Sequence, residues 1–445
     1  MPTNSVDNER IAVIGAGISG LTAAYRLKQA GKEPTVFEAS DYVGGRIKSF
    51  KQSDFLVDIG AFIFLGSYLE SVDLIKELGL EPELGRFDAY GAMPRDGELK
   101  FLDFNKPIRT ILGTDYLSNG SKLKSIKLFR LLYKHWDHLN YQDAAGIAEI
   151  DTDTVASYCR RELNEEIYQY LASVVVRGPW LTNPETTSIG QLLWTLKNFF
   201  KPYFYGLNGG MDALPRALAK CLNVKLEHKV LNVTDYGDYT EVTYIDNKGV
   251  EHAERFDRCV IATTTDQALR MFPQMSPVQK TFYEQTEYIS SVNTHLCLSE
   301  RPANPATYIM VSPKENPDLC GVIVDHLKAA NRAPDHKGQI TVFCRTEWGQ
   351  KNMESPDQKI IEQVLGFLKP YYGDLSLTLE DYAIGRWPMV VPKMPQGRFK
   401  QIVQYQKSID PRARVQFAGD LEPIGGVNAA LVSGQKAAKR IIEKA

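Results

Sequence analysis

The chain of 445 residues is long enough for two or three domains and for a large buried cofactor. Its content of 43% hydrophobic and 24% charged residues excludes extensive disorder. A net charge of -2, from 52 basic and 54 acidic residues, excludes a global positive field that would attract nucleic acid.

The N-terminal residues and the cysteines narrow the class of protein further. The segment MPTNSVDNER lacks the basic and apolar regions of a signal peptide, and the chain holds no run of about 18 apolar residues. The six cysteines are scattered, without a C-x-x-C or a paired Cys/His spacing. We therefore expect a cytoplasmic protein without a spanning helix, a metal site or a disulfide framework.

Residues 11–38 follow the pattern strand, glycine turn, helix, strand and acid. In such a G-x-G-x-x-G turn, the first glycine permits a tight turn, the second lets the backbone approach a pyrophosphate, and the third lets the helix pack on the strand. The helix start favours phosphate, and the acid accepts hydrogen bonds from a ribose. The pattern predicts a dinucleotide site that includes Gly15, Ala16, Gly17, Ile18, Ser19, Gly20, Glu38 and Ala39.

A second glycine turn, Gly44-Gly45, is followed by Arg46, eight residues after Glu38. A nicotinamide site has no need of such a turn, whereas an extended FAD has more of its length to be held. The turn would bring the chain back toward the phosphates, where the Arg46 guanidinium offsets their charge with forked donors. We therefore expect FAD rather than NAD.

These motifs and the following DIGAFIF segment resemble the FAD-binding half of the flavin-containing amine oxidase superfamily, which includes protoporphyrinogen oxidases and carotenoid desaturases. The resemblance implies that backbone near Gly60, Ala61 and Phe62 lies beside the isoalloxazine. It also implies that Val230 passes the adenine, and that CVIATT, residues 259–264, is a core strand of the nucleotide domain whose Thr263 contacts the cofactor.

The middle of the chain is predicted to be helical at first and then strand-rich. Residues 121–139 read as a helix with Leu123, Ile126, Leu128, Leu131, Leu132 and Leu139 on an apolar side and five basic residues around it. Such a helix can contact a membrane peripherally or cover a substrate entrance. We favour a helix packed in the substrate domain, with a solvated basic face.

Residues 151–200 read as helical, with a break at RGPWLTNPETTS where Gly178, Pro179 and Pro184 forbid a continuous helix. Alternating and apolar runs between residues 290 and 393 predict a largely antiparallel sheet with a helix around residues 356–369.

The C-terminal segment VQFAGDLEPIGGVNAALVSGQKAAKRII predicts a strand, a glycine-containing loop and a helix that begins near Val427. The helix start would aim its amides at the flavin and stabilise negative charge on it. The string is similar to the closing motif of the superfamily. It adds Gly419, Asp420, Gly426, Val427, Asn428 and Ala430 to the predicted cofactor contacts.

Departures from the family pattern indicate which branch the chain resembles. Amine oxidases of the monoamine type place an aromatic residue in the closing loop as one wall of a cage for the substrate nitrogen, and Gly426 takes that place here. They also commonly carry a lysine on a strand below the flavin, but the strand SSVNTHLCLS has none. A covalent flavin of the mammalian type needs a cysteine in the C-terminal loop, and no cysteine follows Cys344. The flavin should therefore be non-covalent, and an amine cage is disfavoured. Four looser stretches resemble protoporphyrinogen oxidase-like proteins, namely VVVRGPWLTNPETTSIGQL, FYGLNGGMDALPRAL, GRWPMVVPKMPQGRF and IGGVNAALVSG.

The resemblance implies an FAD-dependent oxidoreductase that removes hydride from a C–N or C–C bond of a largely apolar small molecule, with oxygen or another acceptor reoxidising the flavin. The alternatives are an amine or amino-acid oxidase, a redox-neutral isomerase and a non-catalytic FAD-binding protein. Catalytic side chains cannot be named, and for each pocket candidate core packing is an equal reading; His295 is better read as structural. The pocket candidates are Phe62, Phe64, Arg177, Trp180, Tyr203, Tyr205, His295 and Trp387.

The order of the motifs predicts an α/β fold with two interleaved domains. Residues 8–85, 208–275 and 405–445 would form a Rossmann-type FAD-binding domain, and residues 86–207 and 276–404 an α+β substrate-binding domain with a mixed or antiparallel sheet. Because the insertions follow parallel strands, we expect them over the carboxyl ends, where the flavin emerges. The pocket would lie between residues 60–64 and 425–428 on one side, and residues 175–206 and the strands after 290 on the other.

Overall fold

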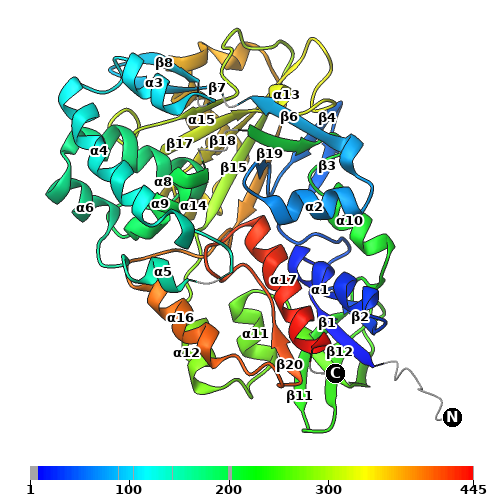
Figure 1. Cartoon of the computed structure of the whole chain (residues 1–445). Helices are drawn as coiled ribbons and strands as arrows, with labels where there is room; N and C mark the ends of the chain where they lie inside the picture. Colours follow the sequence, from blue (N-terminus) through cyan, green and yellow to red (C-terminus); the bar gives the residue numbers. More distant parts are fainter. Residues whose placement is uncertain (1–8, 89, 104, 143, 199–202, 444–445) are drawn as a thin grey trace.

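The computed structural model describes residues 9–88, 90–103, 105–142, 144–198 and 203–443. The predicted segments also include residues outside these ranges, among them 8, 199–202 and 444–445. The strands form a five-stranded parallel sheet and a larger, seven-stranded sheet. In Figure 1 the first lies at the lower right and the second in the upper half, with helices at its left.

The five-stranded sheet is assembled from three separated parts of the chain, as a Rossmann-type domain with long insertions requires. All four strand pairings are parallel. Their order is β10 (Asn223–Lys225), β2 (Glu33–Phe37), β1 (Arg10–Ile14), β14 (Arg258–Ile261) and β20 (Val415–Phe417). Helices α1 (Ile18–Gln29) and α17 (Val427–Ile442) pack against each other beside it (Figure 1). The mixed α/β class is thereby confirmed, while the domain boundaries stay a prediction.

The seven-stranded sheet carries the predicted antiparallel region. It runs in the order β19 (Leu379–Trp387), β15 (Ser291–Leu298), β18 (Gly338–Cys344), β17 (Leu319–Val324), β16 (Tyr308–Met310), β7 (Tyr90–Arg95) and β8 (Glu98–Asp103). The strands β7 and β8, which we did not expect here, join through the one parallel pairing of this sheet, β7 with β16. One face packs on α15 (Asp357–Tyr372), the helix expected around residues 356–369.

The other strands form smaller sheets. They are β11 (Lys229–Asp235), β12 (Thr240–Ile245) and β13 (Glu251–Phe256); β3 (Ser49–Gln52) and β4 (Phe55–Asp58); and β5 (Phe64–Leu65), β9 (Tyr203–Leu207) and β6 (Leu84–Asp88).

The helices between residues 107 and 198 cover one side of the larger sheet (Figure 1). They are α3 (Pro107–Gly113), α4 (Asn119–Lys134), α5 (Ala145–Ala148), α6 (Val155–Glu162), α7 (Glu165–Ile167), a π-helical turn (Tyr168–Ala172), α8 (Ser173–Trp180) and α9 (Ile189–Asn198). The predicted break falls later than expected, because Gly178 and Pro179 still belong to α8, which stops at Leu181 with a φ of 55°. The remaining helices are α2 (Leu69–Glu77), α10 (Ala213–Lys220), α11 (Thr265–Met271), α12 (Pro277–Glu284), α13 (Asp325–Lys328), α14 (Thr346–Asn352) and α16 (Arg398–Ser408).

The predicted apolar side of residues 121–139 is divided in the structure. Leu128 and Leu132 are buried, and Leu139 lies beyond the end of α4 and is buried too, but Leu123 and Ile126 are 71% and 51% exposed. A single apolar face was therefore wrong, because the packed face of α4 is completed by the small residues Ser121 and Ser125.

Candidate functional site

The first glycine turn connects β1 to α1. Gly15 has a φ of 100°, and a Cβ placed on it would lie 2.7 Å from the carbonyl oxygen of Ala262. A Cβ on Gly20 would lie 2.0 Å from the carbonyl oxygen of Gly15, so the helix can approach the strand only without a side chain there. Gly17 differs, because an added Cβ would meet nothing within 4 Å among the described residues. Its surroundings leave room for a ligand at the start of α1.

Glu38 follows β2 and holds this turn in place. Its carboxylate accepts hydrogen bonds from the backbone N–H of Ala16 at 2.8 Å and of Ser40 at 2.9 Å. The backbone of Glu38 also accepts a hydrogen bond from the N–H of His228, which brings the start of β11 and Val230 to this edge. Each carboxylate oxygen retains a lone pair for a ribose hydroxyl.

The second glycine turn lies against the first. Gly44 and Gly45 have φ values of 109° and 58°, and the N–H of Gly44 donates to the carbonyl oxygen of Ala16 at 2.8 Å. A Cβ on Gly45 would lie 3.5 Å from the Cα of Gly17. The chain therefore does return to the first glycine turn.

The guanidinium of Arg46 is paired with the closing segment of the chain. Its Nη1 and Nη2 donate to the two carboxylate oxygens of Asp420 at 2.8 and 3.0 Å, and Nη1 also donates to the carbonyl oxygen of Val390 at 2.6 Å. Asp420 is 4% exposed. This forked pair joins the second glycine turn to the segment after β20.

The closing loop leads from β20 into α17. Gly419 donates its N–H to Ser433 Oγ at 3.2 Å, and Gly426, with a φ of 112°, caps α17. Val427 and Ala430 lie in the first turn of this helix, where the Ala430 N–H donates to the carbonyl oxygen of Gly426.

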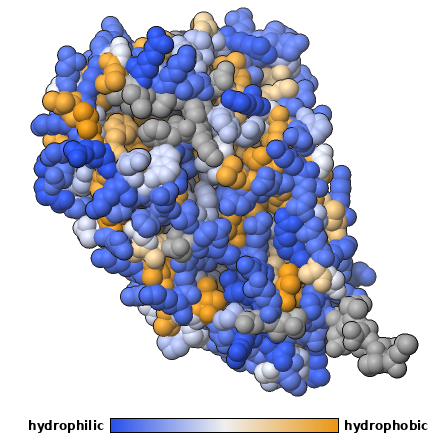
Figure 2. All heavy atoms as spheres, in the orientation of Figure 1, coloured by the Kyte–Doolittle hydropathy of each residue, from blue (hydrophilic) through white to orange (hydrophobic). Residues whose placement is uncertain are grey.

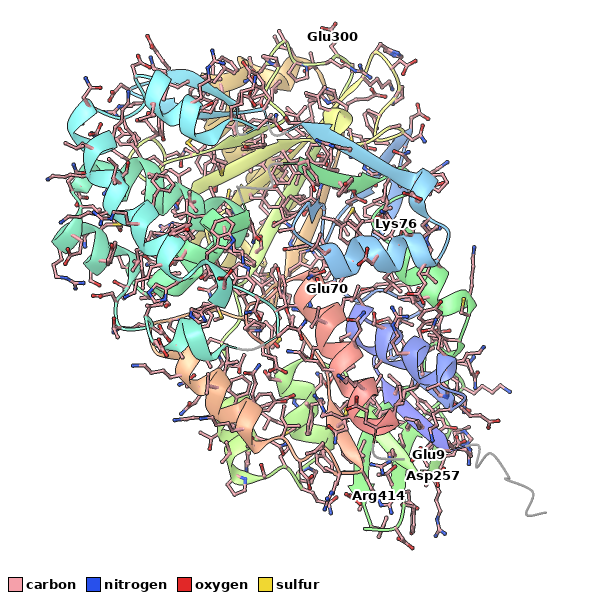
Figure 3. The ribbon with its side chains drawn as sticks, in the orientation of Figure 1. Glu9, Glu70, Lys76, Asp257, Glu300 and Arg414 are labelled. Atoms are coloured by element: carbon pink, nitrogen blue, oxygen red, sulfur yellow. The ribbon has the colours of Figure 1, made fainter. Side chains whose placement is uncertain are left out.

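The side chain of Asn428 contacts α2. Its Oδ1 accepts from the N–H and the hydroxyl of Ser71, and its Nδ2 donates to Glu70 at 2.9 Å. Figure 3 labels Glu70 beside the start of α17. These three contacts join α17 to α2, and the predicted contact of Asn428 with the cofactor stays a prediction.

Residues 59–61 lie between the second glycine turn and the seven-stranded sheet. The N–H of Ala61 donates to the carbonyl oxygen of Arg46, and a Cβ on Gly60 would lie 2.1 Å from that same oxygen. On the other side, Trp387 Nε1 donates to the carbonyl oxygen of Ile59 at 2.9 Å. The segment implied to border the isoalloxazine is thus fixed on both sides.

An apolar cavity opens between α8, α9 and the strands β5, β6, β9 and β16–β18. The cavity is partly open to solvent. It is lined by Phe62, Ile63, Leu65, Phe87, Gly178, Pro179, Trp180, Thr195, Asn198, Phe204, Tyr308, Ile309, Met310, Gly321, Val322, Ile323 and Phe343. The hydroxyl and amide groups of Thr195 and Asn198 are among its few polar groups.

Trp180 connects this cavity to the closing loop. Its indole N–H donates to Thr195 Oγ1 at 2.8 Å, and its ring lies 4.0 Å from the position of a Cβ on Gly426. The Tyr68 hydroxyl lies 3.5 Å from the same position, and burial raises the pKa of Tyr68 to about 12. A neutral phenol and an indole therefore border the loop where an amine cage would have its aromatic residue.

The predicted pocket residues are divided between this cavity and the protein core. Phe62 and Trp180 line the cavity, with Phe62 against Phe343 at a ring-centroid distance of 4.6 Å. The neighbours Tyr203 and Tyr205 do not line it, because alternation along β9 turns Phe204 to the cavity instead.

The other predicted residues lie away from the cavity lining. Phe64 is fully buried, and Arg177 donates to the carbonyl oxygen of Pro317. Thr263 lies beside the first glycine turn, where its methyl group would be 3.5 Å from a Cβ on Gly15. Sequence reasoning missed Phe87, Tyr308, Met310 and Phe343, since only the pairing of distant strands brings them together.

His295 belongs to a buried polar chain, and its structural reading stays a prediction. Its Nδ1 is 2.8 Å from Thr341 Oγ1, which donates to Asp325 at 2.6 Å. Asp325 accepts from Lys328 at 2.7 Å, and Lys328 also donates to Asp58 at 2.9 Å. Burial lowers the pKa of His295 to about 4, so the imidazole is neutral at neutral pH.

Asp58 ends this chain on β4. Burial alone would raise its pKa, but Lys328 and Arg332, both fully buried, hold the pKa below its ordinary value. The chain of contacts joins β4, two residues before Gly60, to α13 and the seven-stranded sheet.

Comparison with known proteins identifies the class. The sequence profile described as flavin containing amine oxidoreductase matches residues 18–442, and the chain belongs to this family. Mitochondrial protoporphyrinogen oxidase of Nicotiana tabacum is 33% identical over 205 residues, which are 44% of this chain and 38% of that protein. The match to an Arabidopsis thaliana protoporphyrinogen oxidase covers 51% of that relative, so the chain spans about half or less of these two proteins.

Other relatives match over their full length. Coproporphyrinogen III oxidase of Staphylococcus aureus is 22% identical over 97% of this chain and 98% of its own. Among solved structures, a protein of Exiguobacterium that is described as a protoporphyrinogen oxidase has a TM-score of 0.75 at 17% identity, and the match covers 99% of this chain and 100% of that one. Putrescine oxidase bound to putrescine has a TM-score of 0.80 at 17% identity, covering 98% of this chain and 99% of that one. The resemblance inferred from the motifs is confirmed, and the two solved structures show the shared fold. Within the described residues, no helix combines the length and apolar character needed to cross a membrane.

Proposed function

We propose that the chain binds FAD non-covalently in the cradle formed by the two glycine turns and the closing loop. The open side of Gly17 supports this, because Gly15 and Gly20 are crowded by the protein while Gly17 is not. Gly17 is also the N-cap of α1, where backbone N–H groups favour a phosphate. The last cysteine, Cys344, is buried in the seven-stranded sheet, so no thiol of the closing loop offers a covalent link.

In this proposal, each part of the cradle holds a different part of the cofactor. Residues 15–20 and 44–46 would hold the pyrophosphate, Glu38 the ribose and Val230 the adenine. Gly60, Ala61 and the start of α17 would border the isoalloxazine, which supplies a hydride acceptor at N5 when it is bound. The Arg46–Asp420 pair fixes the two sides of the cradle relative to each other.

We propose that the reaction is dehydrogenation of a C–N or C–C bond of a largely apolar small molecule, in which a hydride leaves the carbon and a proton leaves the neighbouring nitrogen or carbon, with oxygen or another acceptor taking the two electrons. The observation that carries this is Trp180, which lines the apolar cavity and also borders the closing loop. The cavity walls would exclude water and orient the substrate. Location in the cytoplasm stays part of the proposal.

Between substrate classes, a porphyrinogen-type substrate is our first candidate. The full-length similarity to coproporphyrinogen III oxidase supports it. A second candidate is an amine, which Tyr68 and Trp180 favour because two aromatic rings border the position of Gly426.

Anaerobic titration of the FAD-loaded protein separates these candidates. Coproporphyrinogen III and protoporphyrinogen are added in one series, and putrescine and cyclohexylamine in another, while the flavin absorbance is followed. We expect lasting bleaching in the first series and recovery on admitting air. Bleaching only by amines would select the second candidate. Turnover without lasting bleaching would indicate an isomerase, and a protein that takes up no FAD would refute the proposal.

A further inference from the structure

The segment from β7 to the end of α4 exposes apolar side chains beside basic ones. Six large hydrophobic residues in residues 90–133 are exposed, which is close to half of the exposed large hydrophobic residues found in the whole described chain. They are Tyr90, Phe101, Leu112, Leu123, Ile126 and Tyr133. Figure 2 shows hydrophobic residues among hydrophilic ones at the upper left edge, where Figure 1 places α3 and α4.

On α4 these residues form a stripe opposite the packed face. Leu123, Ile126 and Tyr133 are separated by three and seven residues, a spacing that places them on one side of a helix. Their exposed fractions are 71%, 51% and 83%, whereas Leu128 and Leu132 on the other side are buried. The helix thus has two apolar sides, one packed on the core and one exposed to solvent.

The charge of α4 is of one sign. Its sixteen residues contain Lys122, Lys124, Lys127, Arg130 and Lys134 and no acidic residue, although the whole chain has a net charge of -2. Arg130 lies within the apolar stripe, and Lys127 and Lys134 lie at its edge. Among the described residues, the ion pair within 4 Å that involves one of these cations is Lys127 with Glu162 at 3.8 Å, and both side chains are exposed. Solvent-exposed pairs of this kind contribute little.

We propose that α4, with the adjoining α3, binds the surface of an anionic lipid membrane through Leu123, Ile126 and Tyr133 and the surrounding basic residues. The charge supports this occupant, because anionic headgroups complement five cations while the apolar stripe enters the boundary of the acyl chains. A protein partner would have to be acidic and apolar at once along one helix face.

The anchoring of α4 suits it to this role. Its N-terminus is fixed by Glu166, whose carboxylate accepts from the N–H and hydroxyl of Ser118 and from the hydroxyl of Ser121. Burial opposes the charge, but these hydrogen bonds lower the pKa of Glu166 to about 2. The buried face of α4 packs on α9, which lines the apolar cavity through Thr195 and Asn198. The lipid-facing helix therefore lies one helix away from the cavity proposed for an apolar substrate.

Sedimentation of the full-length, FAD-loaded protein with vesicles tests the proposal without any substrate, so its failure is distinguishable from failure of the proposed reaction. One vesicle type contains phosphatidylcholine alone, and the other also contains phosphatidylglycerol. We expect binding to the second type that weakens as salt is raised. The variant K127Q/R130Q/K134Q should bind these vesicles on the order of a hundredfold more weakly, at about fivefold for each cation.

A second variant tests the apolar stripe, and a third serves as a control. L123Q/I126Q keeps every charge, and we expect it to lose the part of binding that survives high salt. The control K359Q/L377Q removes one exposed cation and one residue that is 85% exposed from another surface, and it should bind as the unchanged protein does. Equal weakening in the control would refute the proposal. So would absence of vesicle binding at low salt, or a dimer in light scattering that the α4 variants abolish.

Discussion

At the scale of single residues, Gly17 is the most direct test of the cofactor cradle. The substitution Gly17→Val adds a side chain whose Cβ would meet nothing within 4 Å among the described residues, and the φ of -70° and ψ of 170° are extended values that valine adopts. We expect the protein to fold and to bind FAD at least about tenfold more weakly, because the pyrophosphate can no longer approach the backbone.

The measurement is the FAD content after dialysis, together with the thermal midpoint of the apoprotein. A matched control is Gly366→Val on α15, another glycine with open space around its Cβ position, which should retain its FAD. Full FAD content in Gly17→Val would contradict the proposed position of the pyrophosphate.

The conformation of the glycine turns could be predicted because it is local, while their contacts with the cofactor stay a prediction. The positive φ of Gly15, Gly44 and Gly45 is required by turns of a few residues, and the sequence pattern of such turns is specific. The residues that line the cavity were predicted less well. Tyr203 and Tyr205 were chosen for their chemistry, but the pairing of β9 with β5 and β6 decides which side of the strand faces the cavity. That pairing joins residues more than a hundred positions apart.

At the scale of elements, the contact between α1 and α17 depends on Gly434. A Cβ at this position would lie 2.2 Å from the carbonyl oxygen of Ser19, which belongs to the first turn of α1. The substitution Gly434→Ala should therefore lower the free energy of unfolding by about 1–3 kcal/mol, although alanine favours helix by about 1 kcal/mol.

Denaturant unfolding of the two variants Gly434→Ala and Gly366→Ala measures the difference. Gly366 also lies in a helix but has nothing within 4 Å of its Cβ position, so its substitution should leave stability unchanged or raise it. A gain in stability for both variants would show that α1 and α17 can separate without cost.

Elements with strong periodicity were predicted well, and elements fixed by distant partners were not. The helix α15 and the final helix α17 lie within a few residues of their expected ranges. By contrast, β7 and β8 were missed, because their place in the seven-stranded sheet depends on β16, more than 200 residues later. The two apolar sides of α4 were merged for a related reason, since periodicity alone does not show which side packs.

At the scale of the whole molecule, the buried charges around Lys328 join two parts of the chain. One is β4, near the proposed cofactor site, and the other is the seven-stranded sheet. Lys328 donates to Asp58 on β4 and to Asp325, the first residue of α13, and none of the three side chains is more than 3% exposed. The sequence gives no local sign of this cluster, because its members come from segments that meet only in the folded chain.

The substitution Lys328→Met should lower the free energy of unfolding by about 3–5 kcal/mol. Methionine fills a similar volume but leaves the carboxylates of Asp58 and Asp325 buried with less positive charge beside them, and Arg332 can compensate only at Asp58. Because Asp58 lies two residues before Gly60, we also expect the variant to lose FAD at a lower denaturant concentration than the unchanged protein does. Denaturant unfolding followed by both flavin and tryptophan fluorescence measures the two effects.

The control Lys393→Met removes an exposed pair with Glu287 and should change stability by less than about 1 kcal/mol. If Lys328→Met behaved like this control, the buried cluster would not be what holds β4 to the seven-stranded sheet.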